Sequence, residues 1–376
     1  MTDMAAMLRL DLAGRIGSDG WREALDKVPR ERFLGDVIFQ LDEARGDLWA
    51  LARRANMPQH EWLALVYADV TLVTQVDGVM AGDATGAVAG SPTSSSTRPS
   101  LVVRMLEAAE IQEGDKVLEI GTGTGYSTAL MCQRLGNNAV CSIEYDPVVA
   151  GRARDAITSV GHTPTLVEGD GLLGYAGKAP YDRLISTCAV RTIPQAWPEQ
   201  TRVGGTITTP MSGWMHETAF AHLTVMEDGS ATGRLLPDDL YFMTARAHVP
   251  PPRPPLVKGI GDARNTEVDP AILERGTALW VAQLAAPQAQ IAWGENVTFL
   301  VDAGTGSRAE IRPDTAGGWT VLQHGPVRLW DAVEEAICTW QAAGSPHQSG
   351  FGLTVSRESQ RVWLGDPDGP SWYLPA

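Results

Sequence analysis

The sequence predicts an α/β fold built around a parallel sheet, and two observations indicate it. From Pro99 onward, short apolar runs alternate with helix-forming stretches, a pattern typical of βαβ units. Within it, the run VLEIGTGTGY at 117–126 places an acid and three alternating glycines directly after an apolar strand. Glycine tolerates positive φ and has no Cβ, so the chain can turn sharply and a ligand can lie against the backbone. Open α/β sheets bind nucleotide-like ligands at this position.

The elements of this region follow one another in a regular order. Helices are expected at 100–111, 126–136 and 147–161, and a further helix lies between 191 and 200. Strands are expected at 116–120, 139–146, 163–171 and 181–189, followed by a GG turn and another strand. Residues 214–230 are typical of antiparallel strands. We therefore expect one sheet domain over residues 91–248.

The flanking regions have a different texture. Residues 1–90 are expected to form a helical N-terminal region that Pro29 and Pro58 interrupt, and the Ser/Thr/Gly-rich stretch 82–100 a loop. The stretch VPPPRPPLVKG at 249–259 is a stiff proline-rich linker. Residues 260–376, which are rich in tryptophan, are expected to form an additional C-terminal α+β domain for peptide recognition.

Composition excludes several classes of function. The 376 residues include 44% hydrophobic side chains and carry a formal net charge of −15, so a nucleic-acid partner is not expected. The four cysteines form no CxxC pair, which indicates a reducing cytoplasm and no zinc site. No apolar run approaches the roughly 20 residues of a transmembrane helix, and the amino terminus lacks a signal sequence. We expect a soluble cytoplasmic protein without metal or membrane partners.

The glycine turn narrows the class of cofactor. No lysine follows the glycines, which excludes a P-loop. The GxGxG spacing is compatible with S-adenosylmethionine, and a dinucleotide remains an alternative. Glu119 before the turn suits a cationic sulfonium, and Glu144 lies near the offset at which an acid meets ribose hydroxyls. Asp170 ends the third strand, where it could meet the adenine or cap a helix.

Several motifs then occur in an order that resembles the protein-L-isoaspartate O-methyltransferase family. The resemblance covers about residues 20–225 and implies a Rossmann-like methyltransferase sheet, S-adenosylmethionine as the methyl donor and S-adenosylhomocysteine as the product. The motifs that carry it are VPRERF at 28–33, STRPS at 96–100, VLEIGTGTGY, SIEYD, EGDG, PYDRLIST and IPQAW.

The resemblance also implies two sets of site residues. A hydroxyl-bearing segment would face the acceptor carboxylate, namely Ser95, Ser96 and Thr97, with Thr97 standing where the family usually has serine. The residues expected to line the cofactor are Glu119, Gly121, Thr122, Gly123, Tyr126, Ser127, Glu144, Tyr145, Asp170, Gly171 and Thr187.

The length of the chain suggests a more specific function. Housekeeping members of the family are shorter, whereas extended members act in the biosynthesis of ribosomal peptides such as lanthipeptides and graspetides. The resemblance therefore implies methylation of an aspartyl side chain in a cyclised precursor peptide, leading to aspartimide or isoaspartate. Two alternatives remain: a housekeeping repair enzyme for isoaspartyl residues in damaged proteins, and a non-catalytic peptide-binding module. Arg98 and Arg191 are candidates for contacting an acidic peptide.

Overall fold

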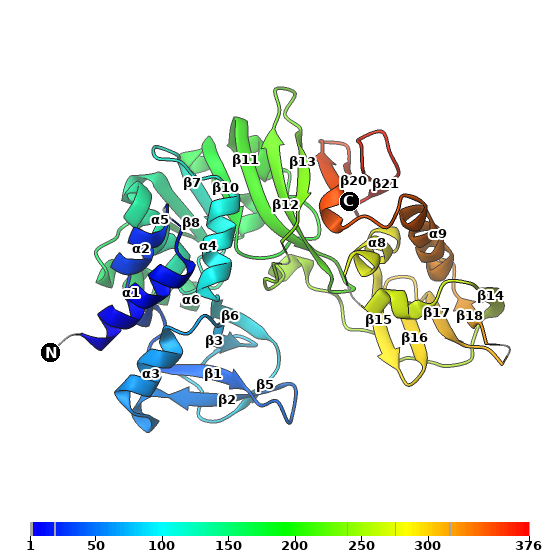
Figure 1. Ribbon diagram of the computed structural model, residues 1–376, viewed down its shortest axis with the longest axis horizontal. Helices are drawn as coiled ribbons and strands as arrows, with labels where there is room; N and C mark the ends of the chain where they lie inside the picture. Colours follow the sequence, from blue (N-terminus) through cyan, green and yellow to red (C-terminus); the bar gives the residue numbers. More distant parts are fainter. Residues whose placement is uncertain (1–2, 19, 239, 275, 316, 376) are drawn as a thin grey trace. The chain divides into compact units, whose positions relative to one another are not determined.

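The chain folds into two compact units, shown in the computed structural model of Figure 1, which describes residues 3–375 except 19, 239, 275 and 316. The first unit comprises Met1–Thr187 and Ala196–Thr208, and the second comprises Cys188–Gln195 and Thr209–Ala376. The units therefore do not divide at a single point along the chain.

The first unit begins with a mixed α/β region. Its helices are α1 (Met4–Ile16), α2 (Arg22–Lys27) and α3 (Gln59–Val66), with 3-10 turns η1 (Arg30–Phe33) and η2 (Arg54–Asn56). Its strands are β1 (Val37–Leu41), β2 (Leu48–Arg53), β3 (Leu72–Val76), β4 (Val79–Met80), β5 (Val88–Ala89) and β6 (Pro92–Ser96). They form one sheet in the order β4-β3-β1-β2-β5, with β6 also paired to β3.

This sheet corrects two expectations. The helical prediction for residues 1–90 is wrong at 37–41, 48–53, 72–76, 79–80 and 88–89, which are strands. The run LWALAR at 48–53 pairs antiparallel with β1 instead of continuing a helix. Such a short apolar run suits either periodicity, so its partner in space decides the structure. The loop expected at 82–100 contains β5 and β6. Both helix interruptions are confirmed: α2 ends just before Pro29, and Pro58 directly precedes α3.

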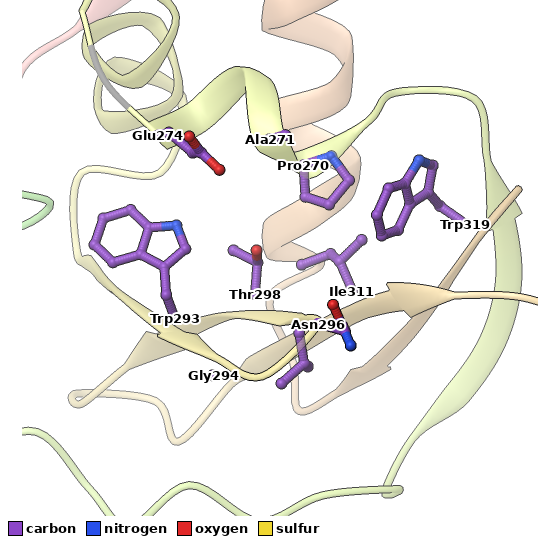
Figure 2. A pocket seen from close by; sticks show the side chains of 10 residues that line it. Pro270, Ala271, Glu274, Trp293, Gly294, Asn296, Thr298, Ile311 and Trp319 are labelled. Carbon is purple, nitrogen blue, oxygen red and sulfur yellow. The ribbon is translucent and has the colours of Figure 1, made fainter.

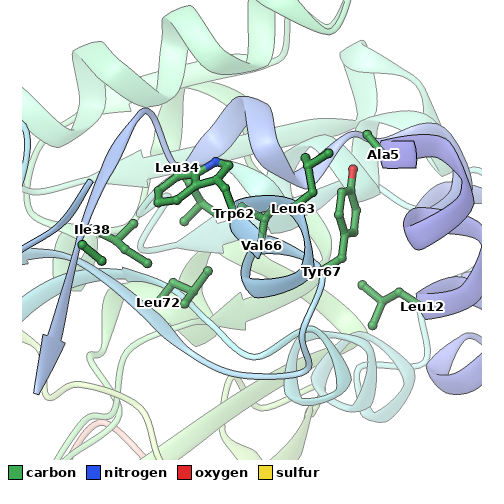
Figure 3. Packing of buried hydrophobic residues seen from close by; sticks show 10 residues of the cluster. Ala5, Leu12, Leu34, Ile38, Trp62, Leu63, Val66, Tyr67 and Leu72 are labelled. Carbon is green, nitrogen blue, oxygen red and sulfur yellow. The ribbon is translucent and has the colours of Figure 1, made fainter. Parts of the chain in front are cut away.

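Helix α3 packs against this sheet through a buried cluster. Trp62 and Val66 of the helix meet Ile38 of β1 and Leu72 of β3, and each of the four is at most 3% exposed (Figure 3). Burying large apolar side chains on both elements stabilises the region by about 1.5–3 kcal/mol for each side chain.

The parallel sheet that the sequence predicts is confirmed in the first unit. Its strand order is β9-β8-β7-β10-β11, with all neighbouring pairs parallel. The strands are β7 (Val117–Ile120), β8 (Val140–Glu144), β9 (Thr165–Glu168), β10 (Tyr181–Ser186) and β11 (Thr201–Ser212). The accompanying helices are α4 (Pro99–Ala108), α5 (Tyr126–Leu135), α6 (Pro147–Ser159) and α7 (Ala196–Gln200), with turns η3 (Asn137–Ala139), η4 (Gly171–Leu173) and η5 (Ala176–Lys178).

The second unit is rich in antiparallel strands. One group is β12 (Thr218–Val225), β13 (Ala231–Leu236), β19 (Phe351–Val355), β20 (Gln360–Leu364) and β21 (Ser371–Tyr373). A separate five-stranded sheet has the order β14-β18-β17-β16-β15. Its strands are β14 (Asp262–Thr266), β15 (Ala289–Gly294), β16 (Val297–Asp302), β17 (Arg308–Pro313) and β18 (Trp319–His324). The helical elements are α8 (Thr277–Ala285), α9 (Leu329–Ala342), η6 (Arg246–His248), η7 (Pro270–Glu274) and η8 (Gln348–Gly350).

Strand pairing explains why the second unit begins before the proline-rich segment. Strand β13 pairs with β19 from Ala231↔Val355 to Arg234↔Gly352, which joins residues on both sides of 249–259. The 249–259 segment itself carries neither helix nor strand.

Among the described residues, no helix is long and apolar enough to span a bilayer. Over the same residues, no group of three or more histidine, cysteine or acidic side chains is placed to hold a metal ion.

Candidate functional site

The turn between β7 and α5 depends on its glycines. Gly121, Gly123 and Gly125 have φ values of 92°, 55° and 89°, which side chains other than glycine rarely adopt. A Cβ on Gly121 would lie 2.5 Å from Thr187 Oγ1, and one on Gly125 would lie 2.9 Å from Ile157 Cδ1. Thr187 Oγ1 also donates to the Gly121 carbonyl at 2.5 Å, so it supports the turn from the neighbouring strand.

Glu119 is held beneath this turn. It is fully buried and accepts hydrogen bonds from Ser127 Oγ, Thr128 Oγ1 and Ser142 Oγ at 2.5, 2.5 and 2.7 Å. Thr122 Oγ1 lies 2.7 Å from Ser142 Oγ and extends this hydroxyl network. Burial raises the pKa of Glu119 above its ordinary value despite the three donors. The structure therefore places Glu119, Thr122 and Ser127 as supports of the turn rather than at its surface.

Glu144 has a different environment. It ends β8, is half-buried, and its two carboxylate oxygens accept from the backbone N–H groups of Gly123 at 2.8 Å and Asp146 at 3.0 Å. Burial raises the pKa of Glu144 as well. The adjacent Tyr145 is 59% exposed. Glu144 thus reaches the glycine turn and can still accept further hydrogen bonds from a ligand.

Asp170 and Gly171 follow β9. One oxygen of Asp170 accepts from Leu172 N at 2.9 Å, so Asp170 caps η4. Helix capping was one of the two roles expected for this residue. The other oxygen has no partner among the described residues. A Cβ on Gly171 would lie 2.4 Å from Ile120 Cγ2, so the chain here can approach β7 only because residue 171 is glycine.

Strand alternation separates the predicted hydroxyl residues. Ser94 and Ser96 point inward and are at most 4% exposed, and Thr74 Oγ1 donates to Ser94 Oγ at 3.2 Å. Ser95 and Thr97 are half-buried, and in the described part of the chain their hydroxyls have no hydrogen-bond partner. The hydroxyls available to an acceptor are therefore those of Ser95 and Thr97, not that of Ser96.

Strand β6 passes beside the glycine turn. A Cβ on Gly123 would lie 3.6 Å from the carbonyl oxygen of Ser95, so these two backbones are close. Gly123 therefore lies beside the Ser95 backbone and also donates its N–H to Glu144, so both residues adjoin the glycine turn. The structure does not bring Tyr126 to the surface: that ring is 3% exposed and packs edge-on against Phe33, with its pKa raised to about 12 by burial.

Arg30, which was not among the residues expected at the site, supports the segment that carries the predicted hydroxyls. Its guanidinium is fully buried and donates to Ser96 Oγ at 3.3 Å and to the Thr97 carbonyl at 3.2 Å. The other acceptors, 2.7–3.1 Å away, are the carbonyls of Val66, Ala68, Val70 and Ser96. Burial lowers its pKa to about 10, so it stays charged at neutral pH. Arg30 therefore fixes the end of β6, and its only signal in the sequence was its place in VPRERF.

The two arginines expected to contact a peptide lie in different settings. The side chain of Arg98 is exposed. Arg191, in the second unit, donates to the Pro287 carbonyl at 2.7 Å and lies over the Trp214 ring, with its guanidinium carbon 3.7 Å from the ring centre. Arg191 is therefore engaged within its own unit, and of the two only Arg98 is exposed to a peptide.

Comparison with known proteins gives a consistent result. The family model for "Protein-L-isoaspartate(D-aspartate) O-methyltransferase (PCMT)" matches residues 55–241. The protein-L-isoaspartate O-methyltransferase of Ignicoccus hospitalis is 38% identical over 141 residues, or 37% of this chain and 67% of the relative. That of Methanococcus aeolicus is 30% identical over 164 residues, 43% of this chain and 71% of the relative. Protein-L-isoaspartate O-methyltransferase 2 of Archaeoglobus fulgidus is 40% identical over 115 residues, 30% of this chain and only 52% of the relative.

A solved structure extends the likeness in fold. A protein-L-isoaspartate O-methyltransferase aligns with a TM-score of 0.56 at 20% identity, covering 96% of this chain and 99% of its own. The similarity of fold therefore includes residues of the second unit, so the added C-terminal part is not peculiar to this chain.

Proposed function

The chain belongs to the protein-L-isoaspartate O-methyltransferase family, and on that premise we propose that it transfers a methyl group from S-adenosylmethionine to a peptide carboxylate. The observation that carries the proposal is the placement of Ser95, Gly123 and Glu144. A bare glycine backbone, an accessible carboxylate and an unengaged hydroxyl residue lie together at the carboxyl end of the parallel sheet.

The residues of the turn fit this cofactor. Its amino acid end would meet the backbone at Gly121 and Gly123, and its ribose hydroxyls would donate to Glu144. The free oxygen of Asp170 and the exposed ring of Tyr145 would contact the adenine. When bound, S-adenosylmethionine supplies an electrophilic methyl group.

The acceptor needs little chemical activation. A carboxylate has a reference pKa near 3.9, so at neutral pH it is already the nucleophile and no general base is required. Hydroxyls of Ser95 and Thr97 would hold it by hydrogen bonds that leave its charge in place. Alignment of the carboxylate with the methyl group and exclusion of water can lower the barrier by roughly 7–11 kcal/mol.

Within this reaction we propose the aspartyl side chain of a cyclised ribosomal peptide as the acceptor. The backbone amide nitrogen after the methylated residue attacks the ester carbonyl, loses its proton and releases methanol, which forms aspartimide. Hydrolysis of that imide gives isoaspartate. The resemblance to extended biosynthetic members supports this acceptor, whereas an isoaspartyl residue in a damaged protein is the alternative. Since a solved family member shares the fold over 96% of the chain, length does not decide between them.

Methyl transfer to two peptides tests the proposal. The full chain is incubated with S-adenosylmethionine and either a linear isoaspartyl peptide or a cyclised aspartyl peptide, and products are followed by mass spectrometry. A gain of about 14 Da on the cyclised peptide, followed by loss of methanol, supports the biosynthetic acceptor. Methylation of the isoaspartyl peptide alone supports repair. If neither reacts and calorimetry detects no S-adenosylhomocysteine binding, the chain is a non-catalytic module.

A substitution tests the assignment of the hydroxyl residue. Ser95→Ala should lower kcat without changing S-adenosylhomocysteine affinity, because we assign its hydroxyl to the acceptor rather than to the cofactor. Ser91→Ala is the matched control, because Ser91 is exposed and precedes β6. An unchanged kcat in Ser95→Ala would assign the acceptor contact to Thr97.

A further inference from the structure

The second unit contains a pocket that the proposed reaction does not use. It has a volume of about 440 Å³, within the range of small-ligand sites. Residues from η7 border it on one side and residues from the five-stranded sheet on the other (Figure 2). The lining includes Pro270, Glu274, Trp293, Thr298, Ile311 and Trp319.

The register of the sheet explains how these side chains come together. Trp293 of β15 lies opposite Thr298 of β16, and Thr298 lies opposite Ile311 of β17. Residues directly opposite one another share a face of the sheet. Trp319 of β18 pairs with Pro313 of β17, which lies two residues beyond Ile311 and therefore on the same face of the sheet. The four side chains therefore form one contiguous surface across four strands.

The exposure of Trp293 distinguishes it from most tryptophans of this region. Its side chain is 52% exposed, whereas Trp280 and Trp330 are at most 2% exposed. Core packing, the role expected for most of these residues, accounts for Trp280 and Trp330. It does not account for a large aromatic ring left in solvent at the edge of a cavity.

The polar groups of the pocket are few and unengaged. Glu274 is the charged residue of the lining, and it is exposed. Among the residues that the structure describes, its carboxylate has no ion-pair partner, and the side chains of Asn296 and Thr298 have no hydrogen-bond partner. In Figure 2, Glu274 and Pro270 both project from η7, across the pocket from the sheet residues Trp293 and Thr298. A mainly apolar pocket with a few free polar groups is typical of a ligand site.

We propose that this pocket binds a lysine or arginine side chain of the peptide substrate, outside the methylated residue; this inference rests on the proposed function. Aromatic faces attract a cation, and the Glu274 carboxylate provides the opposite charge. The aliphatic stem of the same side chain would cover Pro270 and Ile311. An anionic occupant would be repelled by the Glu274 carboxylate, and a wholly apolar one would offer it no opposite charge.

Paired peptides test the inference in the full chain. Two acceptor peptides of the class that is methylated differ only in carrying lysine or norleucine at one position, and that position is varied along an extended peptide. At the spacing that lets the lysine reach the pocket, the lysine peptide should have a KM about tenfold lower at unchanged kcat. Glu274→Gln and Trp293→Ala should each abolish this difference. Glu295 is an exposed acid in the turn between β15 and β16 and does not line the pocket, so Glu295→Gln should preserve the difference in KM.

A binding measurement keeps this inference separate from the proposed reaction. Acetyl-Ala-Lys-Ala-amide, titrated in the absence of S-adenosylmethionine, should change the tryptophan fluorescence of the natural chain but not that of Trp293→Ala. This result would stand even if no peptide were methylated. Equal binding of the norleucine counterpart would overturn the inference in favour of an apolar site. So would a lysine preference that survives Glu274→Gln, and so would no fluorescence change with either peptide.

Discussion

Two glutamates lie at or next to the ends of adjacent strands of the parallel sheet, yet their surroundings give them different roles. Glu119 is fully buried and its carboxylate is occupied by three hydroxyl donors. Glu144 accepts two backbone hydrogen bonds and remains partly accessible. One acid therefore stabilises the turn, while the other can contact a ligand.

Replacing Glu144 with glutamine should weaken S-adenosylhomocysteine binding about tenfold or more. Hydrogen bonds to a charged group contribute about 1.5–3 kcal/mol each, and the amide offers only one acceptor. Calorimetry measures the change. Glu168→Gln is the control, because Glu168 ends the next strand, is exposed, and should leave affinity unchanged. Equal affinities in both variants would contradict the assigned role of Glu144.

Glu119 should give stability a characteristic pH dependence. Its pKa is raised in the folded state, so the protonated form favours folding; this contribution is present below the unfolded pKa, near 4.5, and is lost as pH rises through the folded pKa. The melting temperature of the natural chain relative to Glu119→Gln should therefore be highest at acidic pH and fall as pH increases. Thermal melts at several pH values measure this difference, and a difference that is independent of pH would contradict it.

At the scale of elements, the site is a junction between β7, α5 and the end of β6. The backbone of β6 comes close to Gly123, and Arg30 holds the end of that strand through the carbonyls of Ser96 and Thr97. These contacts join residues far apart in the sequence. The position of the hydroxyls that we propose to contact the acceptor therefore depends on both the N-terminal sheet and the parallel sheet.

Gly121→Ala should destabilise the chain more than Gly114→Ala. Both glycines have φ near 90°, but a Cβ at residue 114 meets no atom within 4 Å, whereas one at residue 121 meets Thr187 Oγ1. Gly114→Ala should lose about 1–2 kcal/mol of unfolding free energy from backbone strain, and Gly121→Ala should lose about 1–3 kcal/mol more. Denaturant titration measures both losses. Equal losses of unfolding free energy would contradict the prediction, because they would mean that Thr187 moves away from the new Cβ without destabilising the chain.

At the scale of the whole molecule, the second unit contains residues from before and after the proline-rich segment at 249–259. The Ile193 backbone N–H donates to Gln360 Oε1 at 2.8 Å, and Gln360 Nε2 donates to the Ile193 carbonyl at 2.7 Å. Arg191 likewise bonds to Pro287. The segment 188–195 is thus part of a structure that the last 120 or so residues complete.

A chain truncated after residue 248 should be poorly stable. The cut removes β19 and leaves β13 with an unpaired edge, which favours aggregation. Soluble yield and melting temperature measure the effect. A single tryptic cut at Lys258, which is exposed, should in contrast leave the two fragments associated on gel filtration. A well-folded truncated chain would contradict this division of the molecule.

Local sequence patterns predicted most of the parallel sheet and its glycine turn. At 117–126 an apolar run is followed by glycines, and at 139–146 an apolar run is followed by an acid. Both patterns involve only neighbouring residues, so they can be recognised without knowing which distant segments pack against them. The strand at 48–53 was missed because its short apolar pattern fits helix and strand equally. The roles of Ser96 and Arg30 were missed because each depends on the other across 66 residues.

The sequence by itself thus determined the sheet, the turn and the identity of the acids and hydroxyls beside it, because backbone preference and periodicity are properties of neighbouring residues. Only the tertiary structure decided that Glu119 is enclosed and Glu144 accessible, and that Ser95 rather than Ser96 is available. It alone also showed that Trp293 borders a pocket while Trp280 and Trp330 fill the core. Burial and hydrogen-bond partners are set by segments distant in the chain, so the same residue types acquire different roles only once the fold is formed.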